Sequence, residues 1–143
     1  MAIRTASAEW QGGVQDGTGT VASASGALEG QYSYSSRFEE GTGTTPEELI
    51  AAAHASCFSM ALSFDLANAG HVVDSVRTEA KVHLLKDGDG FAIKRITLTT
   101  VGRVPGIDAA TFQAAAEGAK AGCPISKALA AVETIELEAT LES

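Results

Sequence analysis

Short stretches of alternating small and polar residues fill the first part of the chain. Residues 6–10 and 19–24 alternate in this way, and the glycine-rich segment 12–17 lies between them. Alternation on both sides of a turn signal is typical of a β-hairpin. Residues 31–35 alternate again, which predicts a third strand with Tyr32 and Tyr34 on one face.

The pattern then changes abruptly to that of one long helix. Thr45 can cap a helix, Pro46 suits its first position, and Glu48 has the spacing that completes a capping box. The helix is expected to run to about residue 69, where Gly70 supplies a left-handed end. Its apolar residues extend nearly all the way round, so we expect it to be buried on most sides, by sheet and by a second subunit.

The second half of the chain alternates strand and helix patterns. Residues 76–84 and 91–104 predict a long hairpin, Asp108 caps a helix over 109–121, a short helix spans 124–131, and 134–139 form a last strand. The order is strands, helix, strands, helices and strand, without βαβ repetition. This order predicts an α+β protein, and 143 residues fit one domain, 1–143.

Charge and targeting signals narrow the class of protein. The net charge is -8, from 18 acidic and 10 basic residues, and the basic residues are scattered. Such a surface repels phosphate backbones, so no nucleic acid partner and no anionic membrane are expected. Polar residues interrupt the apolar stretch 49–66, which favours a core helix over a membrane span. The N-terminus lacks a signal-peptide pattern, and we expect the cytoplasm.

The two cysteines, Cys57 and Cys123, are the candidates for chemistry. Thiols stay reduced in the cytosol, so these two are either inert core residues or reactive groups. Cys123 precedes Pro124 at the start of a short helix, where a thiolate is favoured. Cys57 lies inside the long helix and would need a cation from elsewhere in the fold. His54 lies one turn away, but further ligands with metal-site spacing are missing, so no metal is expected.

Three segments carry a resemblance to a known family. Arg37-Phe38-Glu39 and GTTPEELIAAAHASCFSMAL (43–62), followed by AKAGCPIS (119–126), resemble the OsmC/Ohr family of hydroperoxide reductases. The resemblance spans essentially the whole chain and is closer to the OsmC subgroup. It implies an intertwined homodimer in which two sheets wrap around long central helices.

The resemblance also assigns roles to four residues. Cys57 matches the peroxidatic cysteine and Cys123 matches the resolving cysteine. Arg37 matches the arginine that holds the thiolate, and Glu47 matches the acid that orients this arginine. The implied cycle has three steps: a Cys57 sulfenic acid, a Cys57–Cys123 disulfide, and reduction by an external dithiol or dithiol protein. The substrate would be an organic hydroperoxide or hydrogen peroxide, reduced in oxidative or osmotic stress defence. No cofactor is implied.

The spacing of Glu47 and Cys57 bears on how such a site is assembled. Ten residues of continuous helix rise about 15 Å, which excludes direct contact between the two. Either the helix breaks, or Arg37 and Glu47 serve the Cys57 of a second subunit. The second arrangement is favoured, because members of the family are similar shared-site homodimers.

Two other functions fit the same residues. A binding or storage module would carry two unreactive thiols. A redox sensor would form the same disulfide and pass the signal to a partner protein.

Overall fold

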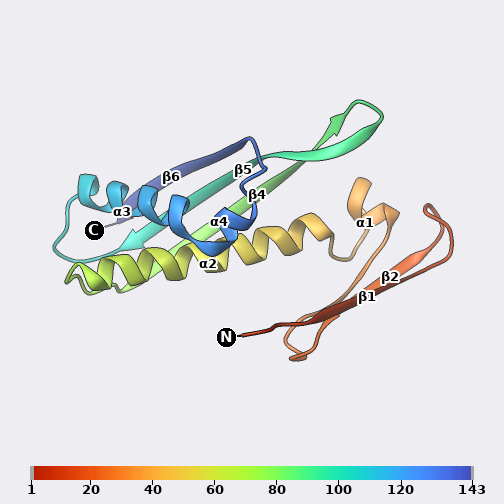
Figure 1. Cartoon of the computed structure of the whole chain (residues 1–143), viewed down its shortest axis with the longest axis horizontal. Helices are drawn as coiled ribbons and strands as arrows, with labels where there is room; N and C mark the ends of the chain where they lie inside the picture. The colour runs from red at the N-terminus through yellow and green to blue at the C-terminus, as the bar shows by residue number, and fades with distance from the viewer. Residues whose placement is uncertain (1, 143) are drawn as a thin grey trace. The chain divides into compact units, whose positions relative to one another are not determined.

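The chain forms six strands and four helices across residues 2–142, which are the residues described by this computed structural model (Figure 1). In order along the chain, the elements are β1 (Ala6–Gln11), β2 (Thr18–Ser23), β3 (Glu29–Tyr32), α1 (Tyr34–Phe38), α2 (Pro46–Asn68), β4 (Ser75–Asp87), β5 (Gly90–Arg103), α3 (Ala109–Gly122), α4 (Pro124–Ala128) and β6 (Thr134–Glu142). They divide into two units, one ending at Leu49 and the other beginning at Ile50. The mixed α+β class is therefore confirmed.

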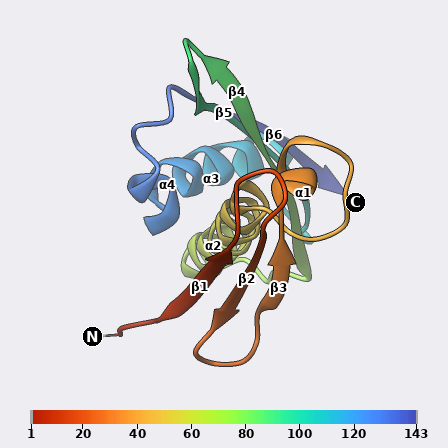
Figure 2. The same ribbon diagram turned by 90° about the vertical axis from the view of Figure 1, so that its right-hand side faces the viewer.

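The first unit contains an antiparallel sheet in the order β1-β2-β3 (Figure 2). The predicted hairpin is present, with Ala6 opposite Ser23 and Gln11 opposite Thr18. The third strand ends at Tyr32, so the prediction that it continues to residue 35 is wrong. A short helix replaces its end, because Ser33 and Ser36 form a reciprocal capping box.

The long helix α2 begins and ends close to the predicted residues. The Glu48 N–H donates to Thr45 Oγ1 over 2.9 Å, and Gly70 adopts a φ of 91° beyond the C-terminal end. Only this half of the predicted capping box forms, because the Glu48 carboxylate accepts its hydrogen bond from Thr44 Oγ1, over 2.8 Å. The helix is continuous from Pro46 to Asn68.

The second unit contains the sheet β4-β5-β6. The long hairpin β4–β5 pairs antiparallel, as predicted, with an irregularity between His83 and Leu84. Strand β6 pairs parallel to β5, with Arg95 opposite Thr134. Parallel neighbours require a crossover connection, and α3 and α4 supply it. The sequence prediction did not include this parallel pair.

The core of the second unit forms where α2 and α3 pack on the sheet. Every fourth residue of α2 from position 54 to 66 is buried: His54, Phe58, Leu62 and Leu66. The three apolar members of this stripe join Ile96 and Leu98 of β5 and the buried face of α3. A stripe with this spacing runs along one face of a helix.

The opposite side of α2 is uncovered by this chain. Met60 is 76% exposed and Phe64 is 66% exposed, and 22% of the most apolar window of the helix is buried. The chain alone covers one side of α2, and the expected burial of its other side by a second subunit stays a prediction. Among residues 2–142, α2 is the one helix long and apolar enough to cross a membrane, a test that core helices of soluble proteins also pass.

The close packing of α3 on β5 fixes the position of the crossover. Asp108 caps α3 as predicted, accepting a hydrogen bond from the Thr111 N–H over 2.7 Å. A Cβ at Gly102 would lie 2.2 Å from the Phe112 ring, so only glycine lets the helix approach this closely. Cys123 lies at the C-terminal end of α3, where it is both the C-cap residue of α3 and the N-cap residue of α4.

Candidate active site

The two cysteines lie against each other in the second unit. Cys57 comes from the middle of α2 and is half-buried, whereas Cys123 comes from the junction of α3 and α4 and is fully buried. Both are free thiols, and they lie close enough for each to shift the pKa of the other. Residues 66 positions apart in the chain are thus brought into contact.

Residues of α4 surround the Cys123 sulfur with donors. The Ser126 N–H donates to Cys123 Sγ over 3.4 Å, and the Ser126 side chain also acts to lower the pKa of this thiol. The backbone of Ile125 hydrogen-bonds to both cysteines. Donors aimed at a sulfur stabilise its thiolate form.

These surroundings push the pKa values of the two thiols in opposite directions. Burial has the largest effect on Cys57 and raises its pKa. The Ile125 backbone lowers this pKa by less, and the neighbouring Cys123 raises it again. Burial also acts to raise the pKa of Cys123, but the hydrogen bonds from Ser126, Cys57 and Ile125 outweigh it and lower that pKa. Within the second unit, Cys123 is therefore the more readily ionised thiol.

An open groove of about 430 Å³ gives solvent access to Cys57. Its walls are mostly apolar, and they include the exposed face of α2 and the end of α3: Cys57, Met60, Ala61, Phe64, Asp65, Ala119, Gly122 and Pro124. A groove of this character suits an organic molecule better than a small ion.

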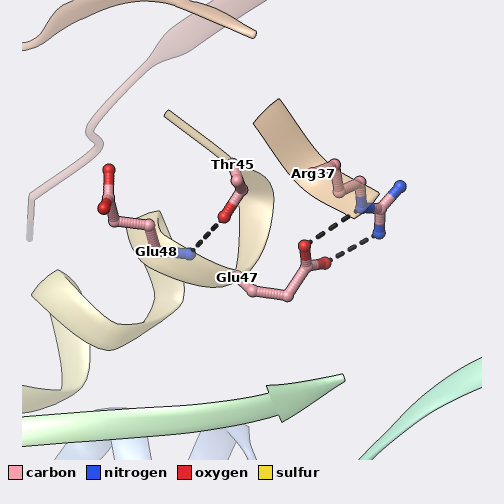
Figure 3. A network of polar contacts seen from close by, with 4 residues as sticks. All are labelled: Arg37, Thr45, Glu47 and Glu48. Carbon is pink, nitrogen blue, oxygen red and sulfur yellow. Dashed lines mark hydrogen bonds and ion pairs between the residues drawn. The ribbon is translucent and has the colours of Figure 1, made fainter. Parts of the chain in front are cut away.

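Arg37 and Glu47 form a bidentate ion pair in the first unit (Figure 3). Arg37 Nε donates to Glu47 Oε1 over 3.0 Å, and Nη2 donates to Oε2 over 2.7 Å. The Glu47 hydrogen bond raises the pKa of Arg37, against a smaller effect of burial. Two parallel bonds fix the plane of the guanidinium, and Nη1 makes no hydrogen bond within residues 2–142. Arg37 thus keeps donors for a further anionic group.

Aromatic side chains lie beside this ion pair. Arg37 lies over the Phe38 ring at 5.3 Å, and Tyr34 packs against Phe38 with ring centroids 5.0 Å apart. These residues line a cavity of about 280 Å³ together with Trp10, Val14, Tyr32 and Ser33. A guanidinium in an aromatic wall combines a fixed charge with apolar surface.

The four predicted site residues thus form two pairs, one in each unit. The predictions did not give Ser126 any part in the site. The spacing from Cys123 to Ser126 could have indicated this contact. Cys123 is the N-cap residue of α4, and the side chain of an N-cap residue accepts a hydrogen bond from the N–H three positions later. His54 is fully buried, and its Nε2 lies 2.8 Å from Ser126 Oγ, while its Nδ1 has no partner within residues 2–142.

A mixed α+β chain with two contacting thiols, one more acidic than the other, defines a dithiol protein suited to redox chemistry. The chain belongs to the OsmC-like protein family, whose model matches residues 39–138. The matched segment contains both cysteines and Glu47 and begins two residues after Arg37.

Named relatives agree with this family. The chain is 50% identical to Peroxiredoxin OsmC of Escherichia coli over 132 residues, which are 92% of each protein. It is 33% identical to the organic hydroperoxide resistance protein OhrB of Bacillus subtilis, over 96% of this chain and 98% of OhrB.

Solved structures give the same fold. The crystal structure of B. subtilis OhrB has a TM-score of 0.68 at 29% identity, covering 96% of this chain and 98% of the other. The OsmC-like protein of Mycoplasma pneumoniae has a TM-score of 0.78 over 99% of both chains. Its identity of 14% makes this a likeness of fold alone.

Proposed function

We propose that the protein is a thiol-dependent peroxidase that reduces organic hydroperoxides, with Cys57 as the peroxidatic and Cys123 as the resolving cysteine. The observation that carries the proposal is the contact between the two thiols, one facing a groove and the other buried. The names of the relatives, Peroxiredoxin OsmC and organic hydroperoxide resistance protein OhrB, support the same activity.

The proposed first step is attack of the Cys57 thiolate on one peroxide oxygen. The O–O bond breaks, a Cys57 sulfenic acid forms, and the leaving alkoxide takes a proton to become an alcohol. The exposed side of Cys57 is the side from which a peroxide in the groove can approach. The apolar groove favours an organic hydroperoxide over hydrogen peroxide, which has no apolar part to bury.

In the second step Cys123 attacks the sulfenic sulfur. A disulfide forms and the sulfenic oxygen leaves as water. An external dithiol or dithiol protein then reduces the disulfide, and both thiols are restored. A cytoplasmic location fits this cycle, because reducing dithiols are available there.

The Cys57 thiolate requires a positive charge, since its own surroundings raise its pKa. Arg37 is the candidate, and Glu47 holds it in place. Glu47 and Cys57 are ten residues apart on one continuous helix, a rise of about 15 Å. We therefore assign to each Cys57 the Arg37 and Glu47 of a partner subunit, in a homodimer with shared sites. The exposed Met60 and Phe64 supply apolar surface for such a partner.

Peroxide consumption with an added dithiol tests the function. Wild type should consume an organic hydroperoxide in repeated turnovers, and Cys57→Ser should lose this activity. Cys123→Ser should still reduce the first equivalent and then stop as a sulfenic acid. Turnover that persists in Cys57→Ser would overturn the assignment, and one stoichiometric oxidation in wild type would point to a sensor.

Mixed dimers test the shared site. A Cys57→Ser chain mixed with an Arg37→Ala chain forms heterodimers in which one site has every residue. If half of the dimers are mixed and each has one working site, about a quarter of wild-type activity returns. Mixing Cys57→Ser with the double variant Cys57→Ser/Arg37→Ala is the control, which restores no site. No recovery in the first mixture would contradict the shared arrangement.

A further inference from the structure

A hydrogen bond between His54 of α2 and Ser126 of α4 lies next to Cys123. His54 Nε2 and Ser126 Oγ lie 2.8 Å apart, and both side chains are buried, with 0% and 6% exposure. Ser126 in turn donates its backbone N–H to Cys123 Sγ over 3.4 Å. The peroxidase cycle described above gives neither His54 nor Ser126 a role.

The tautomer of His54 determines what the Ser126 hydroxyl can do. His54 Nδ1 is buried and has no partner within residues 2–142. If Nδ1 carried the proton, a buried N–H would lack an acceptor, and Ser126 would have to donate its only hydroxyl proton to Nε2. If Nε2 carries the proton, His54 donates to Ser126, and the hydroxyl is free to donate to the Cys123 sulfur. Burial keeps the ring neutral by lowering the pKa of His54.

We propose that His54 and Ser126 form a positioning relay for the resolving step, His54 Nε2–H to Ser126 Oγ and Ser126 O–H to Cys123 Sγ. The relay rests on the peroxidase function proposed above. It holds the Cys123 sulfur as a hydrogen-bonded thiolate aimed at Cys57.

In this step the Cys123 thiolate attacks the sulfur of the Cys57 sulfenic acid. The S–O bond breaks as the S–S bond forms, and the departing hydroxide combines with the proton that Cys123 released, giving water. No further oxidant or reductant is required. His54 and Ser126 touch Cys123 or each other and need not touch the peroxide.

Single-turnover kinetics on the full chain separate this step from peroxide reduction. One equivalent of cumene hydroperoxide is mixed with reduced protein, the sulfenic acid is trapped with a 1,3-diketone, and disulfide is counted by mass spectrometry. Ser126→Ala removes the hydroxyl donor of the relay and keeps the backbone N–H, and disulfide closure should slow about tenfold or more. The sulfenic acid should accumulate and react with the trap.

Conservative variants distinguish the relay from general damage. Ser126→Thr keeps the hydroxyl and His54→Gln keeps an N–H donor, so both should recover most of the closure rate. His54→Leu should resemble Ser126→Ala. Ser59→Ala is the matched control: Ser59 also lies on α2 and donates a hydroxyl hydrogen bond, to Thr78 over 2.8 Å, but it lies outside the relay. Its closure rate should equal that of wild type.

A measurement without peroxide gives an independent test. In a Cys57→Ser background, the ultraviolet absorbance of the thiolate reports the titration of Cys123 alone. Adding Ser126→Ala or His54→Leu should raise the pKa of Cys123, and Ser59→Ala should leave it unchanged. This readout remains valid even if the protein reduces no peroxide.

Three results would overturn the relay. They are an unchanged closure rate in Ser126→Ala, an unchanged Cys123 titration in both relay variants, and equal damage in Ser59→Ala. Failure of the peroxidase function looks different, because wild type itself would then form no sulfenic acid. If Ser126→Ala does not fold, the comparison of His54→Gln with His54→Leu tests the same link.

Discussion

The two pairs of predicted site residues lie in opposite physical environments. Arg37 and Glu47 carry full charges at a partly exposed position, where two short hydrogen bonds hold them. Cys57 is half-buried beside an apolar groove, and Cys123 is fully buried. The first environment maintains a charge easily and has no thiol, whereas in the second burial raises the pKa of Cys57 and disfavours its thiolate. The proposed peroxidase mechanism requires both a fixed cation and a nucleophile, so it combines the two pairs.

Removal of the cation should have the largest effect. Arg37→Ala takes away the donor proposed to stabilise the Cys57 thiolate, and we expect kcat/KM for an organic hydroperoxide to fall by about a thousandfold. Arg103→Ala is the matched control, since Arg103 also pairs with a glutamate, Glu142, on the second sheet. Steady-state assays with a dithiol compare the two. Equal losses in both variants would show that the effect is not specific to Arg37.

The free energy of unfolding should depend more on the core of the second unit than on the Arg37–Glu47 ion pair. Leu62 is fully buried in the core of the second unit, so Leu62→Ala should lower the free energy of unfolding by about 2–5 kcal/mol. Arg37→Ala, at a partly exposed ion pair, should cost no more than about 1 kcal/mol.

Urea denaturation of both variants checks this contrast. Leu28→Ala is the control for the apolar change, because Leu28 is 55% exposed. A larger stability loss in Arg37→Ala than in Leu62→Ala would mean that the ion pair has a structural role.

Loss of the orienting carboxylate should have a smaller effect on activity. Glu47→Gln keeps the shape of the side chain but removes its charge, so Arg37 should remain near its position with weaker bonds. We expect kcat/KM to fall about tenfold. Glu142→Gln serves as the control from the Arg103 pair. A loss as large as that of Arg37→Ala would assign Glu47 a direct part in the chemistry.

The pH dependence should shift rather than disappear. The reactive form of Cys57 is its thiolate, so kcat/KM should rise with pH through the pKa of Cys57. Without Arg37, burial and Cys123 raise that pKa, and the residual activity of Arg37→Ala should rise at higher pH than in wild type. Rate profiles of the two proteins measure the displacement. Coincident profiles would mean that Arg37 does not act on the Cys57 thiolate.

Local signals predicted much of the fold. The cap at Thr45, the glycine at 70 and the alternation over 76–84 act within a few residues, and each predicted element is present. The helix α1 was missed because its capping box consists of two serines in a sequence that alternates like a strand. The parallel pairing of β6 was missed because it depends on contacts across the sheet, which alternation along one strand does not reveal.

The sequence predicted the two cysteines of the site but not the contact between His54 and Ser126. Resemblance identified the cysteines, but chemistry alone favoured Cys123 as the acidic thiol, and its surroundings in the fold agree with that. The hydrogen bond between His54 and Ser126 spans 72 positions of the chain, so neither residue alone indicated the link. Such a contact depends on how α4 packs on α2, which is a property of the folded chain.

The unequal exposure of the two sulfurs also sets the direction of the reductive half of the cycle. Cys123 is fully buried, whereas Cys57 opens on the groove, so an incoming thiolate should meet the sulfur of Cys57. Cys123 then departs as the leaving group, and a thiol whose pKa is lowered leaves faster. The mixed disulfide with the reductant should therefore form on Cys57. The fold of the dithiol form already determines which of the two sulfurs the reductant can reach.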